Sequence, residues 1–138
     1  MVGFWGKRKR EEEAAVAAQD ADLQRRAERA IVEADERVRL TSDELAFAEA
    51  ELGSGQTQDL RTALTSVRTH LAEAFHLHQL NHDEIPDTPD ELRTRNARII
   101  QLSAWAEDLL EERTTALEKP IELARRAPEI IAGVRRDA

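Results

Sequence analysis

Three histidines near the middle of the chain have the residue types and spacing best suited to chemistry, in the segment His76-Leu-His78-Gln-Leu-Asn-His82-Asp83. His78 and His82 are four residues apart, which places two imidazoles on one face of a helix, as a two-histidine metal site requires. Asp83 or Glu84 is the candidate third ligand. The other interpretation is that exposed imidazoles are simply favoured near the negative end of a helix dipole. No glutamate follows His78 as in the HExxH helix of zinc proteases, so we predict no metal and no cofactor.

Paired carboxylates elsewhere in the chain do not by themselves indicate an enzyme. Glu107 is next to Asp108, and Glu111 is next to Glu112. Acid–base catalysis also requires burial and a substrate pocket that shift a carboxyl pKa. The sequence has no cysteine, no glycine-rich phosphate loop and no Ser/His/Asp motif. We therefore predict no catalytic residues and no enzymatic activity, with a metal-dependent sensor or enzyme built on the histidines as the alternative.

The N-terminal ten residues combine aromatic bulk with positive charge. Phe4 and Trp5 are followed by Lys7, Arg8 and a further Lys-Arg pair at 9–10. Tryptophan favours the interface between membrane and water, and basic residues near an anionic bilayer each gain about 1 kcal/mol. The alternative interpretation is a solvated tail. The predicted membrane or partner contacts are Phe4, Trp5, Lys7, Arg8, Lys9 and Arg10.

The charge of the chain is distributed unevenly. The net charge is −8 over 138 residues, and residues 43–91 contain eleven acidic side chains against only Arg61 and Arg68. Binding to nucleic acid requires a basic face, so an acidic body argues against nucleic acid as a partner. No stretch approaches the roughly 20 apolar residues that span a bilayer, and no secretion signal can be recognised. The sequence therefore predicts a cytoplasmic protein.

Long charged helices are the expected elements, because 41% of the residues are hydrophobic, 35% are charged and only 4% are aromatic. Residues 11–52 contain no glycine or proline and predict one helix of about 40 residues, some 60 Å long. From Ala27 onward its apolar residues alternate steps of four and three, which is a heptad pattern with Thr41 at one polar position. Before Ala27 the pattern weakens, since Asp20 occupies an apolar position. This first half is predicted to project as a stalk.

Glycine and proline mark the ends of the remaining helices. Gly53 and Gly55 terminate the first helix, and Thr57 or Ser54 caps a second that runs to about Asn81. A third helix starts at Thr88-Pro89-Asp90-Glu91, where Thr88 is the N-cap and Glu91 completes a capping box. Pro120 and Pro128 are predicted to divide the rest into short helical pieces, 121–126 and 128–136, the second carrying Ile130, Ile131 and Val134.

Short loops between long helices make them antiparallel neighbours, so we predict an all-α, spectrin-like antiparallel three-helix bundle. The chain is a single structural domain in three parts: a basic aromatic stub (1–10), a projecting helical stalk (11–26) and the bundle (27–138). The aromatic side chains of Phe47, Phe75 and Trp105 are predicted to be buried.

Several segments resemble the helical C-terminal region of bacterial TPM-domain membrane proteins. The resemblance rests on residues 43–53 (Asp-Glu-Leu-Ala-Phe-Ala-Glu-Ala-Glu-Leu-Gly), on 71–79 with the acidic proline-containing loop that follows, and on Arg125-Arg-Ala-Pro-Glu129, in the same order over about 90 residues. In that family a globular TPM domain and a transmembrane segment precede a cytoplasmic helical tail. The resemblance implies that Lys7 to Arg10 lie at a cytoplasmic membrane face, and it implies no activity for this chain.

The predicted function is a non-enzymatic helical interaction or scaffold module. We expect it in the cytoplasm, associated with the inner face of the plasma membrane through the stub. Its partners are expected to be proteins or a second copy of the chain. The residues predicted to mediate pairing through the first helix are Val16, Leu23, Ala27 and Ile31.

Overall fold

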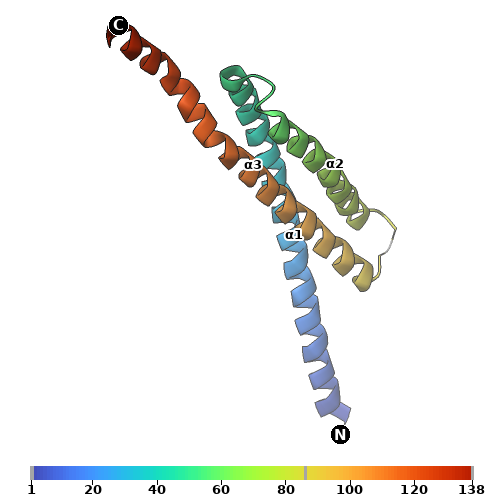
Figure 1. Ribbon diagram of the computed structural model, residues 1–138. Helices are drawn as coiled ribbons and strands as arrows, with labels where there is room; N and C mark the ends of the chain where they lie inside the picture. The colour runs from blue at the N-terminus through green and yellow to red at the C-terminus, as the bar shows by residue number, and fades with distance from the viewer. Residues whose placement is uncertain (1, 86, 138) are drawn as a thin grey trace.

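The computed structural model describes residues 2–85 and 87–137, and side chains are described for 3–85 and 87–127. Three helices follow one another along the chain: α1 (Val2–Leu52), α2 (Gln58–Asn81) and α3 (Pro89–Asp137). Figure 1 shows α1 and α3 running in the same general direction and crossing each other, with α2 running back in the opposite direction alongside them. The predicted all-α bundle of three consecutive, alternating helices is therefore confirmed.

The turn between α1 and α2 is built from glycine. Gly53 has φ +81°, a left-handed conformation that glycine adopts without steric cost, and its N–H donates to the Glu49 carbonyl at 2.8 Å. Thr57 is the N-cap residue of α2, as predicted, but its side chain does not cap the helix. The Thr57 hydroxyl instead donates back to the carbonyls of Gly53 and Ser54. The buried threonine therefore fastens the turn to the end of α1.

The start of α3 agrees with the prediction at Thr88 and Pro89, whereas the Glu91 carboxylate pairs with Arg95 at 3.3 Å in place of the Thr88 N–H that the predicted capping box requires. The Thr88 hydroxyl accepts a hydrogen bond from the Glu91 N–H at 3.2 Å, and Pro89 occupies the first helical position, where its missing N–H costs nothing. Arg95 pairs with Asp87 at 2.8 Å, with both side chains largely shielded from solvent. This ion pair ties the loop before α3 to its second turn.

The core runs along the line where the three helices meet. Ala27, Ile31 and Ala34 supply the α1 side, so the predicted heptad positions are confirmed as the buried face. α1 packs more extensively against α3 than against α2. Small residues on α1 let the helix axes approach closely, and larger ones from α2 and α3 fill the interior. The other members of the core cluster are Ala63, Leu64, Val67, Leu71, Ala74, Ile99, Leu102, Ala106 and Leu110.

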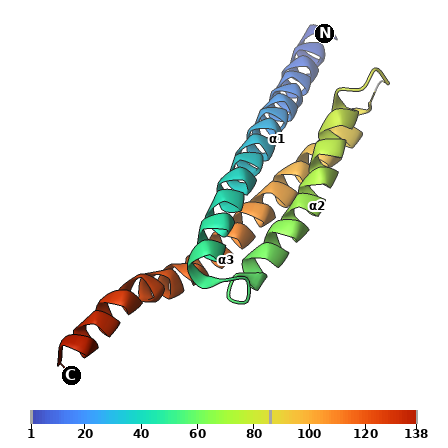
Figure 2. The ribbon, with the colours of Figure 1, turned by 90° about the horizontal axis from the view of Figure 1, so that it is seen from above.

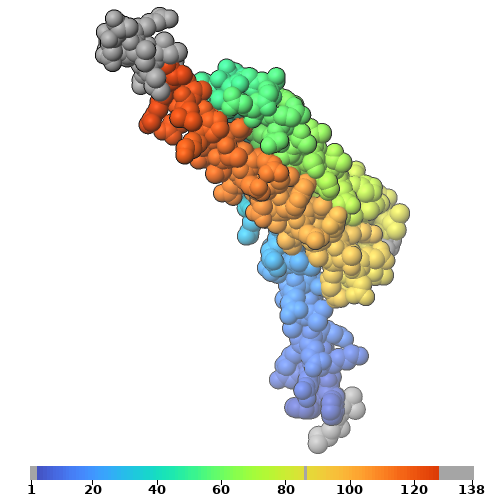
Figure 3. All heavy atoms as spheres, viewed as in Figure 1, coloured from blue at the N-terminus to red at the C-terminus, as the bar shows by residue number. Residues whose placement is uncertain are grey.

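The predicted stub is not separate from the first helix. α1 begins at Val2, so Phe4 to Arg10 form its first turns in place of a non-helical tail. Every side chain from residue 3 to 19 is exposed except Gly6, which is half-exposed. Figure 3 shows this part of α1 projecting from the body of the molecule. The projecting part thus includes the stub and ends near Asp20.

The prediction that proline divides the C-terminal region was wrong. α3 continues from Pro89 to Asp137 and passes through both Pro120 and Pro128. A proline inside a helix removes one hydrogen bond and crowds the carbonyl four residues earlier, which bends a helix without always ending it. Figure 2 shows the C-terminal part of α3 turning away from the other two helices. The predicted packing of Ile130, Ile131 and Val134 falls on side chains outside the described residues.

The three aromatic residues predicted to be buried lie at the surface instead. Phe47 is 46% exposed, Phe75 is 42% exposed and Trp105 is 37% exposed. Arg125 lies over the ring of Phe47, 5.0 Å from its centroid, and His70 packs against Trp105 with the rings tilted by 55° and their centroids 4.6 Å apart. The alanine-rich seam leaves little room for large rings, so these rings lie over the edges of the bundle.

Candidate functional site

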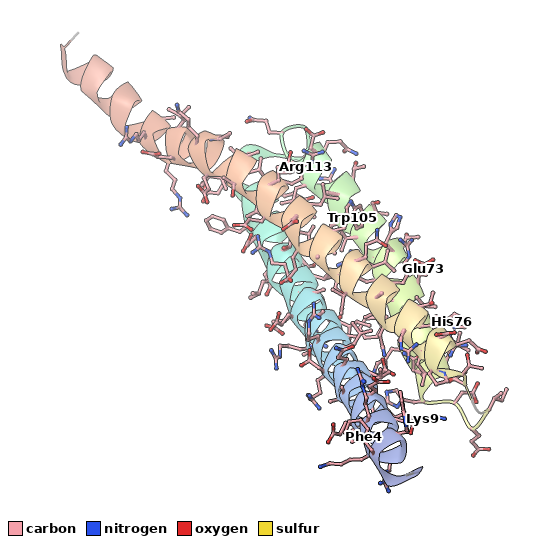
Figure 4. The ribbon with its side chains drawn as sticks, turned by 90° about the horizontal axis from the view of Figure 1, so that it is seen from below. Phe4, Lys9, Glu73, His76, Trp105 and Arg113 are labelled. Atoms are coloured by element: carbon pink, nitrogen blue, oxygen red, sulfur yellow. The ribbon has the colours of Figure 1, made fainter. Side chains whose placement is uncertain are left out.

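The free end of α1 presents its aromatic and basic residues together. Phe4 and Trp5 are each 70% exposed and meet edge to face, with ring centroids 6.4 Å apart. Figure 4 labels Phe4 and Lys9 at this end of α1, and Trp105 and Arg113 farther along the bundle. Arg8 lies 3.7 Å from Glu12 in a fully exposed contact that contributes little to stability.

The four cations form a collar around the helix. Consecutive residues on an α-helix are about 100° apart, so Lys7, Arg8, Lys9 and Arg10 point to all sides. A helix that lies in the plane of a membrane carries its cations on one face and its apolar residues on the other. A collar behind an aromatic turn suits a different contact, in which the end of the helix meets an anionic surface.

The projecting part of α1 is held to α3 by an ion pair. Arg93 donates to both carboxylate oxygens of Asp20, from Nε at 2.7 Å and from a terminal nitrogen at 3.1 Å. Arg93 also contacts Asp90 at 2.8 Å, which orients the guanidinium. Asp20, which interrupts the apolar pattern of the sequence, therefore has a specific partner 73 residues away. The predicted stalk of residues 11–26 is accordingly attached to α3 at Asp20.

Acidification is expected to remove the contribution of Asp20 to stability. The hydrogen bond from Arg93, helped by its charge, holds the pKa of Asp20 below the ordinary value of 3.8. A carboxyl with a lower pKa in the folded state stabilises the fold above its unfolded pKa and loses that effect as the pH falls through the folded pKa. The free energies of unfolding of the native chain and of Asp20→Asn, from urea denaturation, should therefore differ near neutral pH and converge below about pH 4.

Two further variants test whether the ion pair causes this pH dependence. Arg93→Gln should remove the same pH-dependent part as Asp20→Asn, because either change breaks the pair. Asp22→Asn removes an equal charge from the same turn of α1 without touching Arg93, and serves as the control. A difference between native chain and Asp20→Asn that stays constant from about pH 6 to pH 2 would contradict the assignment.

Shallow hollows line the junction between α1 and the start of α3. One of about 320 Å³ is bounded by Ala17 to Gln24 on α1 and by Asp87, Leu92 and Asn96 on the other side. Val16 is 44% exposed beside this junction, and Leu23 is half-buried within it.

Two of the four residues predicted for pairing between chains are part of the core of the bundle instead. Ala27 and Ile31 are buried in the core of the bundle and are 0% and 2% exposed. They are therefore not available to a second copy of the chain. Apolar side chains of α1 that remain exposed include Val16 at 44%, and Val32 and Leu40 at 67% and 50%.

The histidines predicted as metal candidates are brought together by the fold with a ligand from another helix. One potential ligand atom from each of Glu28, His78 and His82 lies within 4.8 Å of the others. His82 Nε2 is 3.5 Å from Glu28 Oε1, and the centroids of the His78 and His82 rings are 4.5 Å apart. Asp83, predicted as the carboxylate, is not a member of this group. Glu28 could not be predicted from the sequence, because nothing local links α1 to the end of α2.

Among the paired carboxylates, Glu107 stands out electrostatically. Burial against α1 raises its pKa, and the negative charge of Glu33 raises it further, while Arg37 acts in the opposite direction. A raised carboxyl pKa by itself is compatible with a structural role. The prediction that the chain has no catalytic residues therefore stays a prediction.

The chain is similar to two curated proteins of Mycobacterium tuberculosis. These are UPF0603 protein Rv2345 of strain ATCC 25618 / H37Rv and UPF0603 protein MT2410 of strain CDC 1551 / Oshkosh. Each is 34% identical over 98 residues, which cover 71% of this chain. The chain spans only about 15% of the length of these relatives. No family model and no solved structure matches the chain.

None of the helices in the described part of the chain has a stretch that is long and apolar enough to cross a membrane.

Proposed function

We propose that this chain is a non-enzymatic helical interaction module, held close to the cytoplasmic face of a membrane by the free end of α1. The observation that carries the proposal is the projecting segment at residues 3–19, which ends in two exposed aromatic rings and a collar of four cations. A helix end with no packing role in its own bundle is free to make an external contact.

The chemistry of this end favours an anionic surface. The aromatic rings of Phe4 and Trp5 suit the depth of the lipid headgroups, and the cations behind them suit anionic phosphates at the same interface. Because the collar surrounds the helix, all four cations reach the headgroups only when the helix approaches end-on. The resemblance to the tail of TPM-domain proteins supports the same arrangement, since it puts residues 7–10 next to a membrane segment.

The rest of the bundle is proposed to face protein partners. Residues 43–91 span the far end of α1, the whole of α2, and the loop and first turn of α3. This part of the chain is strongly acidic and would be repelled by an anionic membrane. The projecting segment would therefore also act as a spacer that keeps the acidic part away from the surface. The proposed partner is a basic protein or a second copy of the chain. A second copy would pair through the exposed face of α1 around Val16.

Binding to vesicles tests the membrane contact. The full chain is expected to co-sediment with vesicles that contain phosphatidylserine at low salt, and to be released by salt. Replacing two of the collar cations, as Lys7→Gln/Lys9→Gln, should weaken partitioning by about 30-fold, since each cation contributes about 1 kcal/mol near an anionic surface.

The matched control removes the same charge elsewhere on the same helix. Arg25→Gln/Arg29→Gln also loses two exposed cations, but at positions beyond the projecting segment. This variant should bind as well as the native chain. Failure of the native chain to bind, or equal losses in both double variants, would overturn the proposed contact.

A further inference from the structure

Glu28, His78 and His82 join two helices at one end of the bundle. Glu28 lies on α1, His78 lies in the last turn of α2, and His82 is the C-cap residue of α2. Glu28 and His78 are half-buried and His82 is exposed, so the group is open to ions from solvent. Gln24 donates to Glu28 Oε1 at 3.3 Å, which helps to orient the carboxylate towards α2.

The distances within the group approach those of a metal site. Ligand atoms bound at 2.0–2.2 Å in a tetrahedral zinc site are about 3.3–3.6 Å apart. The 3.5 Å between Glu28 Oε1 and His82 Nε2 is already close to this value, and no pair of ligand atoms in the group exceeds 4.8 Å. Side-chain rotations that move the ligand atoms by about an ångström would bring all three atoms within bonding distance of a common ion.

The donor set selects the class of ion. Two imidazoles and one carboxylate suit Zn²⁺ and neighbouring transition metals, whereas Mg²⁺ and Ca²⁺ prefer oxygen ligands alone. Three protein ligands leave a fourth position for water. The negative end of the α2 dipole and the adjacent Asp83 and Glu84 also favour a positive ion at this place.

We infer that Glu28, His78 and His82 form a binding site for a divalent transition metal, Zn²⁺ in the first instance, that clamps the C-terminal end of α2 to α1. The bound ion stabilises the folded bundle, because its three ligands come together only in the folded state. The site lies beside the junction of α1 with α3 and does not include the collar at residues 7–10. Metal binding and membrane binding are therefore separate properties.

Thermal unfolding of the full chain, followed by circular dichroism, tests the inference. Zn²⁺ at about a hundredfold excess over its dissociation constant should raise the melting temperature by about 5–10 °C, and EDTA should reverse the rise. Mg²⁺ should produce no shift. Calorimetric titration should give one ion per chain.

Matched variants identify the ligands. His78→Ala and Glu28→Gln should each abolish most of the shift, whereas His76→Ala should retain it, because His76 lies on the same helix outside the group. Asp83→Asn distinguishes the tertiary site from the one that the sequence suggests, and it should also retain the shift. No shift in the native chain, or a shift that survives Glu28→Gln, would overturn the site and leave at most adventitious binding to surface histidines. None of these outcomes depends on vesicle binding.

Discussion

Replacing Leu64 with alanine is expected to lower the free energy of unfolding by about 2–5 kcal/mol. Leu64 is 2% exposed on α2 and belongs to the central cluster, which contains residues of all three helices. Removing its side chain loses buried apolar surface and leaves a cavity that a tightly packed interior closes only in part. Urea denaturation followed by circular dichroism at 222 nm measures the change.

Leu40→Ala is the matched control for this prediction. It deletes the same atoms from α1, but Leu40 is 50% exposed and is not part of the core cluster. Its cost should stay below about 1 kcal/mol. Equal losses in the two variants would mean that the arrangement of α2 against the other helices is wrong.

Replacing Pro120 with alanine is expected to stabilise the C-terminal part of α3. Proline in a helix interior is about 3 kcal/mol less favourable than alanine, because it lacks the N–H that would bond to the Ala116 carbonyl and its ring crowds that group. None of the described side chains at 121–127 is buried, so we expect this segment to open locally before the bundle unfolds. Amide hydrogen exchange at residues 121–127 should therefore slow by about a hundredfold.

Pro89 provides an internal control for the same substitution. It lies at the first position of α3, where the N–H has no partner in the helix, so Pro89→Ala should leave exchange at 121–127 unchanged. If Pro120→Ala leaves these rates unchanged, the helix on either side of Pro120 is held by something other than its backbone hydrogen bonds.

The two ends of the molecule are well separated. Figure 1 shows the free N-terminal end of α1 and the C-terminal end of α3 at opposite ends of the bundle. α1 alone has 51 residues and measures about 76 Å. Under the proposed function, a contact at residues 3–10 would hold the C-terminal end of α3 away from the membrane.

Most of the secondary structure could be predicted because its signals are local. Gly53 ends α1 through its own backbone conformation, and Thr88 with Pro89 starts α3 through a hydrogen bond to the next turn. The heptad pattern after Ala27 also identified the buried face of α1, since periodicity follows directly from helix geometry. The helix break predicted at Pro120 was wrong. A proline raises the local free energy of a helix, but the neighbouring turns decide whether the helix continues in spite of that cost.

The candidate sites depended on contacts that no local pattern contains. His78 and His82 could be placed on one face of a helix from their spacing alone, but their third neighbour is Glu28 and not the adjacent Asp83. Asp20 likewise interrupts an apolar pattern in the sequence, and its partner Arg93 is identified only in the folded structure. Predicting either contact requires knowing how far one helix is shifted along another. A periodic sequence does not determine that shift.

Local signals were sufficient to predict the long helices, the two turns between them and the apolar stripe of each helix, because residues within one or two turns decide those properties. Which side chains meet across the helices, and which large rings lie outside, depends on how the helices pack. Phe47 and Trp105 carry as much apolar surface as any core residue, yet they lie outside an interior that is filled by Ala, Val, Leu and Ile. The distance between helices and their lateral alignment come from the packing of all three together.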